Sequence, residues 1–169
     1  MRLSIIFLLL SFAGLQVDAQ TDKQDLHKIH KLLLQNFSSE RKYAVYDKTK
    51  KNIIRHFDFK NPDGIDTSAS NIWKRAEWKS FLNGVDTSVV PNYSLSTAGK
   101  PWFKIKGKVK KTMVFAPVII SNDGNLAISI LELGYSPGGA SSTMVYFLQK
   151  ENGKWKIKQD RLISISDGS

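Results

Sequence analysis

The sequence predicts an α+β fold in which N-terminal helices pack on an antiparallel meander of about five strands. Two observations carry this prediction. Apolar residues recur at helical spacing in the first half of the chain, and from Trp102 onward they alternate with polar residues or form short runs joined by turn signals. The 169 residues contain no internal repeat and no linker-like stretch, so we expect a single globular domain over residues 20–169.

Residues 1–19 have the pattern of a secretory signal peptide. Arg2 supplies the positive charge, an apolar stretch begins at Ile5, and Val17 and Ala19 are the small residues expected before a cleavage site. The apolar stretch is short for a membrane span, although an uncleaved anchor is the alternative. The chain has no cysteine that could carry a lipid. We therefore expect an exported protein, periplasmic or extracellular, that is not lipid-anchored.

The first helix is expected over residues 22–37, where Thr21 and Gln24 fit a capping box. Its apolar side chains share one face of the helix: Leu26, Ile29, Leu33 and Phe37. Residues 43–46 are a short candidate strand, and Asn61-Pro62-Asp63-Gly64 is a turn signal.

A second helix is expected from about Asn71 to Asn83, with Gly84 well placed just past its C-terminal end. It would pack three apolar side chains into the core: Trp78, Phe81 and Leu82. Residues 47–70 give no clear pattern apart from Ile53, Ile54 and Phe57, whose spacing suggests a helical turn.

The first strands of the second half include an alternating stretch and a hairpin. From Phe103 to Val109, apolar residues alternate with lysines, which is typical of a half-buried strand. Two apolar runs, Met113–Ile120 and Leu126–Leu133, are joined by an Asp-Gly turn and predict a hairpin. Pro117 places a bulge or an edge position in the first run.

The closing segment predicts a second hairpin. Thr143–Gln149 and Trp155–Ile165 are the strand candidates, and Glu151-Asn152-Gly153 is the turn between them. With the preceding strands, this hairpin completes the expected meander.

Residues 112–165 carry a family resemblance. The run Ser121-Asn122-Asp123-Gly124-Asn125-Leu126-Ala127 resembles the hairpin of small exported bacterial proteins of unassigned function. Their pattern continues through a Gly-rich loop, a strand and a closing strand, which here would be Gly138-Gly139, Val145–Gln149, Gly153-Lys154-Trp155-Lys156 and Ile163-Ser164. The closing hairpin is also similar to that of the nuclear-transport-factor-like superfamily, whose curved sheet and packed helices enclose a pocket. The resemblance implies a fold and export, and no catalytic residue.

Residue patterns for catalysis or metal binding are sparse. Without cysteine, the chain has no thiolate ligand or thiol nucleophile. His27 and His30 lie three residues apart on the first predicted helix, but a zinc site needs a third ligand, so a hydrogen-bonded structural role for His30 is the stronger interpretation. No Gly-x-Ser-x-Gly elbow or phosphate-binding motif is present. We expect no metal and no cofactor, and favour a non-enzyme.

Three side chains remain candidates for a pocket. His30 and His56 are titratable, and Glu132 is the only acid within the apolar strand runs. If Glu132 pointed into a pocket, burial would raise its pKa and suit it to acid–base chemistry. The alternative is that Glu132 faces water on the open side of the sheet.

The net charge of +10 is concentrated in three segments: residues 41–60 (net +5), 100–111 (six lysines) and 150–161 (net +3). Two predicted strands each carry lysines on one face. The first strand carries Lys104, Lys106, Lys108 and Lys110, and the second carries Lys154, Lys156 and Lys158. On neighbouring strands they would form a cationic face for a polyanion, such as an anionic glycan or a lipid surface. The alternative is an ordinary solvated strand face, whose lysines deter aggregation. Aromatic residues are scarce between these lysines, which argues against sequence-specific nucleic-acid binding.

These observations favour an exported, soluble, non-catalytic binding or interaction module that engages polyanions through the lysine-rich strands. The first alternative is a nuclear-transport-factor-like pocket protein, a small-ligand carrier or an enzyme, with Glu132 and His30 or His56 facing a cavity closed by the first helix. The second alternative is an assembly subunit whose partner is another envelope protein.

Overall fold

The structure is a computed structural model that describes six stretches of the chain: residues 23–37, 43–63, 70–97, 100–101, 111–135 and 139–166. The expected signal peptide (1–19) and the expected strand at 103–109 lie outside these stretches. Within them, no helix has the length and apolar character needed to cross a bilayer.

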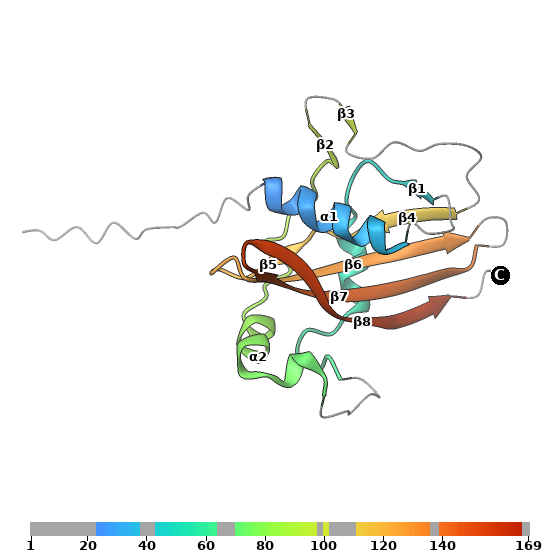
Figure 1. Ribbon diagram of the computed structural model, residues 1–169. Coiled ribbons are helices and arrows are strands. Elements are labelled where there is room, and N and C mark those ends of the chain that lie inside the picture. Colours follow the sequence, from blue (N-terminus) through green and yellow to red (C-terminus); the bar gives the residue numbers. More distant parts are fainter. Residues whose placement is uncertain are drawn as a thin grey trace, which may run out of the picture.

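A six-stranded sheet forms the centre of the described fold (Figure 1). Its strands are β1 (Tyr43–Val45), β4 (Lys111–Phe115), β5 (Ile119–Ile120), β6 (Leu126–Tyr135), β7 (Ser141–Glu151) and β8 (Lys154–Ser166). The order is β1-β4-β6-β7-β8, with β5 also paired to β6. All neighbours are antiparallel except β1, which runs parallel to β4. The α+β class is therefore confirmed, but the sheet is mixed rather than a pure antiparallel meander.

Helices cover both faces of the sheet. The helix α1 (Lys23–Phe37) packs on one face of the sheet. Its bounds are close to the predicted range of 22–37. The other face carries the short helices η1 (Lys51–His56) and η2 (Ile72–Lys74) together with α2 (Ala76–Asn83). A small separate ribbon consists of β2 (Ser96–Thr97) and β3 (Lys100–Pro101).

The second predicted helix is divided in two. Arg75 has extended backbone angles (φ −69°, ψ 146°) and separates η2 from α2. Tertiary bonds hold the first piece in place, because Gln159 on β8 accepts a hydrogen bond from the Ile72 N–H (2.8 Å) and donates one to Asn71 (3.1 Å). These bonds to the sheet outweigh the local preference for one continuous helix. The helical turn expected around Ile53 is present as η1.

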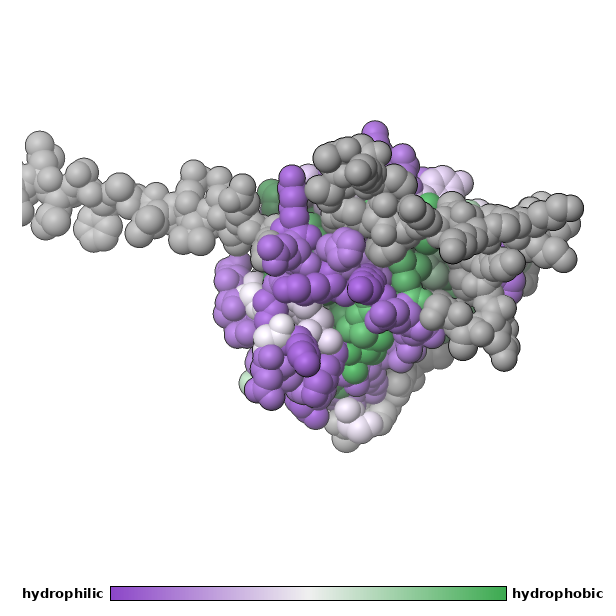
Figure 2. Space-filling model, turned by 45° about the horizontal axis from the view of Figure 1, so that its top comes forward, coloured by the Kyte–Doolittle hydropathy of each residue, from purple (hydrophilic) through white to green (hydrophobic). Residues whose placement is uncertain are grey.

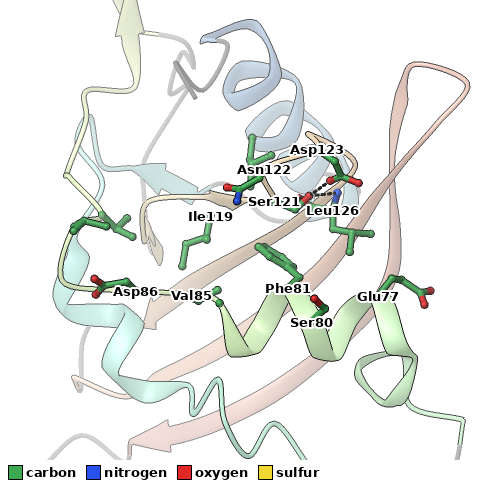
Figure 3. Close-up of a pocket in the computed structure, with 14 residues that line it drawn as sticks. Glu77, Ser80, Phe81, Val85, Asp86, Ile119, Ser121, Asn122, Asp123 and Leu126 are labelled. Atoms are coloured by element: carbon green, nitrogen blue, oxygen red, sulfur yellow. Dashed lines mark hydrogen bonds between the residues drawn. The ribbon is translucent and has the colours of Figure 1, made fainter. Parts of the chain in front are cut away.

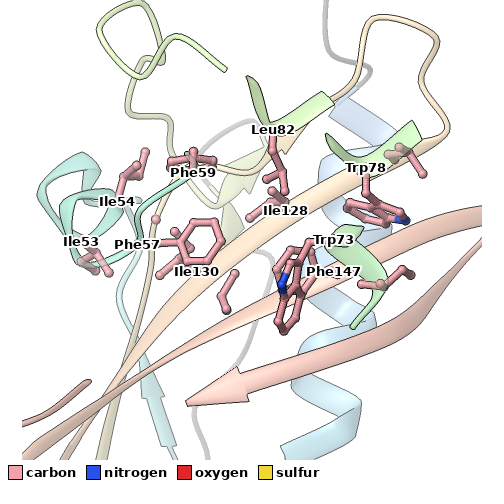
Figure 4. Close-up of a cluster of buried hydrophobic side chains, with 14 of the residues drawn as sticks. Ile53, Ile54, Phe57, Phe59, Trp73, Trp78, Leu82, Ile128, Ile130 and Phe147 are labelled. Atoms are coloured by element: carbon pink, nitrogen blue, oxygen red, sulfur yellow. The ribbon is translucent and has the colours of Figure 1, made fainter. Parts of the chain in front are cut away.

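Apolar side chains fill the space on both faces of the sheet. Along β6, Ile128 and Ile130 point to the α2 side, while Ala127 and Leu131 point to the α1 side. Burial on both faces accounts for the nearly continuous apolar runs in the sequence. The larger cluster on the α2 side is shown in Figure 4 and includes Ile53, Ile54, Phe57, Phe59, Trp73, Trp78, Leu82 and Phe147. On the face shown in Figure 2 most of the coloured residues are hydrophilic, and a hydrophobic area is exposed to the right of the centre of the view.

Both predicted hairpins are present. The β5–β6 turn has Gly124 at φ +70°, and the β7–β8 turn has Asn152 at φ +49° followed by Gly153 at φ +74°. Two consecutive residues with positive φ match the twist of a two-residue hairpin. Pro117 lies between β4 and β5, where the ladder with β6 is interrupted. Proline suits this position because its ring nitrogen has no N–H to donate to the ladder.

Candidate functional site

His30 lies on α1 and is fully buried, and its Nε2 lies 2.9 Å from the Tyr93 hydroxyl. That hydroxyl accepts a hydrogen bond from the Val118 N–H (3.0 Å), so its own proton is available to the imidazole. The His30 ring also contacts the edge of Phe115, with ring centroids 4.5 Å apart. Burial, assisted by the nearby His27, lowers the pKa of His30 to about 3. His30 is therefore a neutral structural residue that joins α1 to the segment around β5.

The other two pocket candidates are elsewhere. His56 is exposed at the end of η1. Glu132 is half-buried on β6, opposite Val114 and Thr143, on the face away from α1. The structure thus does not bring His30, His56 and Glu132 together. The sheet faces are occupied by hydrophobic clusters, and none of the three residues lines either groove described below.

Of the seven candidate lysines, the described ones lie on β8. Lys154 is exposed and has no ion pair within the described stretches. Lys156 and Lys158 both pair with Glu151, with Nζ–O distances of 2.6 and 2.8 Å. Hydrogen bonds from these two ammonium groups lower the pKa of Glu151 to about 2. The remaining four, Lys104, Lys106, Lys108 and Lys110, lie outside the described residues.

The most distinctive surface feature is an open groove of about 570 Å³ between α2 and the β5–β6 hairpin. The floor of the groove is apolar. It is formed by Phe81 and Val85 from the α2 side and by Ile119 and Leu126 from the hairpin side (Figure 3). Val89 also lines the groove and is 73% exposed.

Three carboxylates rim this groove: Glu77 and Asp86 at opposite ends and Asp123 at the hairpin turn (Figure 3). None of the residues that line it in the described part of the chain is basic. A hydrogen bond from Ser88 lowers the pKa of Asp86, and a hydrogen bond from Ser121 lowers that of Asp123. Both are ionised at neutral pH. We call this feature the acidic groove.

A second groove of about 450 Å³ lies between η1 and the end of α2. Its charged rim is mainly cationic, with Lys51, Arg55 and Lys60, and Asp58 is the acid among its lining residues. Asp58 is occupied locally, since it accepts the backbone N–H groups of residues 60 and 61. Lys51 is also engaged, because its ammonium donates to the carbonyl oxygen of Ser88 at 2.6 Å. Val85 lines both grooves, so two sites of opposite charge adjoin at that side chain.

Neither groove is predicted by the sequence. Both are assembled from segments far apart in the chain, such as Glu77 on α2 and Asp123 in the hairpin turn. The sequence carries only a weak indication of the acidic groove. The acids Glu77 and Asp86 flank Phe81 in the sequence, but Phe81 was expected to be in the core. Within the described residues, no group of three or more His, Asp or Glu side chains is placed to hold a metal ion.

Comparison with known proteins adds no identification. No protein-family model, no curated protein and no solved structure matches the chain. The function proposed below therefore rests on the chemistry of the described residues.

Proposed function

We propose that this protein is a non-catalytic binding module whose acidic groove takes a cationic, amphipathic peptide segment. The observation that supports this proposal is the combination of an apolar floor with a rim of three carboxylates. A ligand that fits both would place apolar side chains on Phe81 and Val85 and basic side chains beside Glu77 and Asp86. An open groove suits an extended segment of a larger partner better than an enclosed small molecule.

The net charge of +10 does not oppose such a ligand strongly. At physiological ionic strength, charges farther apart than about 8 Å are largely screened. The ligand in the acidic groove is therefore governed mainly by the nearest charges, those of Glu77, Asp86 and Asp123. Lys51, from the basic segment 41–60, is close enough to Asp86 to lower its pKa, and it offsets part of the attraction at that end. The apolar floor adds about 25 cal/mol for each Å² of nonpolar surface that the ligand buries.

The partner fits the expected location. An exported chain, as residues 1–19 predict, meets envelope and extracellular proteins with exposed basic segments. A single short groove with three rim charges supports weak and reversible binding, with a Kd of roughly micromolar order.

A binding assay with paired substitutions tests the proposal. The probe is a short labelled peptide of alternating leucine and lysine, and the measurement is fluorescence anisotropy. The double variant Glu77→Gln/Asp86→Asn should weaken binding by about fivefold to tenfold, because each exposed ion pair contributes up to about 1 kcal/mol. Asn at position 86 keeps the oxygen that accepts the Ser88 N–H.

Matched controls separate the groove from general charge effects. Asp47→Asn removes an exposed carboxylate that does not line the groove, and it should leave the affinity within about twofold. Val89→Lys adds a positive charge at an exposed groove position and should weaken binding of the same peptide. Equal affinity for the wild type and the double variant would refute the proposal, as would equal binding of a leucine–glutamine peptide.

The polyanion hypothesis is a separate proposal, supported by the concentration of positive charge in three segments. The positive charge that β8 can offer a polyanion is reduced, because Glu151 pairs with Lys156 and Lys158. Lys154 is then the exposed candidate lysine on β8 without an ion pair in the described stretches. Heparin binding that falls steeply with added salt supports it. Absent or salt-independent binding rejects it.

A further inference from the structure

The strand β8 is an edge of the sheet. It pairs with β7 along one side, and no described strand pairs with its other side. The backbone N–H and C=O groups on the outer side of an edge strand are able to hydrogen-bond another strand. Natural proteins protect such edges with charged residues, most often lysine.

The protection covers only the first half of β8. Lys154, Lys156 and Lys158 alternate along that half, whereas residues 162–166 carry no ionisable side chain. Two side chains in the second half are apolar and exposed to solvent: Leu162 (46% exposed) and Ile165 (68% exposed). The uncharged half is therefore the part of the edge at which another strand can add.

A bulge brings the two exposed apolar side chains to the same face. In the ladder with β7, Met144 pairs with Leu162, Thr143 with Ser164 and Ser142 with Ile165. Ile163 is the extra residue, so Leu162 and Ile165 occupy ladder positions two apart although they are three apart in sequence. Without the bulge they would point to opposite faces of the sheet.

We propose that two copies of this chain associate by antiparallel pairing of their β8 strands, with the two-fold axis at Ser164. In this register Leu162 of each copy lies opposite Ile165 of the other copy, which places four apolar side chains together on one face. Ser164 lies opposite itself. The pairing is isologous, as a closed dimer requires.

Charge favours this register over a longer overlap. Pairing about Ser164 leaves Lys154, Lys156 and Lys158 of each copy beyond the end of the other β8 strand, so that no lysine faces a lysine. A more extensive antiparallel overlap centred on the lysine half would bring like charges together. The shared surface is small, and we therefore expect a dimer that dissociates on dilution in the micromolar to millimolar range.

Cysteine cross-linking tests the register directly, because the wild-type chain contains no cysteine. Ser164→Cys places two thiols opposite each other across the axis, within the range for a disulfide, and mild oxidation should give a covalent dimer in high yield. Ser166→Cys is the matched control, because position 166 pairs with Arg161 of the other copy and its thiols lie far apart. Equal cross-linking of the two variants would refute the proposed register.

Sedimentation over a range of concentrations tests the association itself. Wild-type protein should shift from monomer to dimer as its concentration rises, and Ile165→Lys should raise the dissociation constant by at least about tenfold. Position 165 is exposed, so this substitution leaves the core intact. A protein that stays monomeric throughout, or a dimer that Ile165→Lys does not weaken, would overturn the proposal.

Discussion

Lys150 on β7 donates a hydrogen bond from its ammonium to the Oδ2 of Asp25 on α1, which joins residues 125 positions apart in the chain. The same ammonium lies over the ring of Trp155, 5.0 Å from its centroid. Asp25 is buried, and its other oxygen lies 3.5 Å from the Nζ of Lys28. This arrangement fixes the N-terminal end of α1 against the β7–β8 hairpin.

The first prediction is that Asp25→Asn lowers the free energy of unfolding by about 1–3 kcal/mol, because it removes one partner of a largely buried charged hydrogen bond. Burial by itself raises the pKa of Asp25, but the bond from Lys150 and the charges of Lys150 and Lys28 hold it below its ordinary value. The contribution is thus present above pH about 4 and is lost as the pH falls through the lowered folded-state pKa.

Urea unfolding monitored by tryptophan fluorescence measures this effect. Lys28→Gln is the control, because it removes only the exposed member of the cluster and should cost less than about 0.5 kcal/mol. If Lys28→Gln is as destabilising as Asp25→Asn, the pair of Asp25 and Lys150 does not hold α1 in place.

The second prediction concerns His30 and acid. Its folded-state pKa is lowered to about 3 by burial and by His27, whereas an unfolded histidine titrates near 6.5. Between these values the unfolded chain binds a proton that the folded chain does not, so stability falls as the pH decreases. The slope that His30 contributes approaches 1.4 kcal/mol per pH unit.

Unfolding free energies of the wild type, His30→Phe and His30→Gln at pH 7 and pH 5 check this prediction. Both variants lose stability at neutral pH, because the Tyr93 hydroxyl loses its imidazole partner. Their stability should nevertheless change less between the two pH values than that of the wild type, by about 1–2 kcal/mol. Parallel pH profiles for all three proteins would show that His30 is not the residue responsible.

The third prediction is that Gly153→Ala destabilises the protein by about 1–2 kcal/mol. Gly153 has φ +74°, in the left-handed region, and no atom lies within 4 Å of the position that a Cβ would occupy. The expected cost is therefore conformational and not steric. Asn152→Gly, at the neighbouring position with φ +49°, should change stability by only a few tenths of a kcal/mol. A Gly153→Ala variant as stable as the wild type would contradict the assigned turn.

Local patterns in the sequence were sufficient for the elements that depend on neighbouring residues. The stripe of Leu26, Ile29 and Leu33 predicted α1, and the glycines after Asp123 and Asn152 predicted both hairpins. These signals act over a few residues, and the structure confirms them.

Features set by distant contacts were missed. Residues 43–46 were expected as a strand, and β1 covers Tyr43–Val45. So short a segment carries no information about its direction, and its parallel pairing with β4 depends on the tertiary fold. The interruption at Arg75 follows from bonds between η2 and Gln159, some 87 positions away. For the same reason the acidic groove was not predicted, because its walls come from α2 and from the β5–β6 hairpin.

The most direct test of the proposed function is to map the site of the leucine–lysine peptide on the full-length protein by two-dimensional amide NMR. The proposal predicts progressive shifts for amides that line the acidic groove and not the second groove, namely residues 77, 80–81, 84, 86, 89–90 and 119–123, and small changes along β8 and at η1. Saturating shifts confined to the second groove, between η1 and the end of α2, or to β8, or no shifts at all, would contradict the claim that the acidic groove is the binding site.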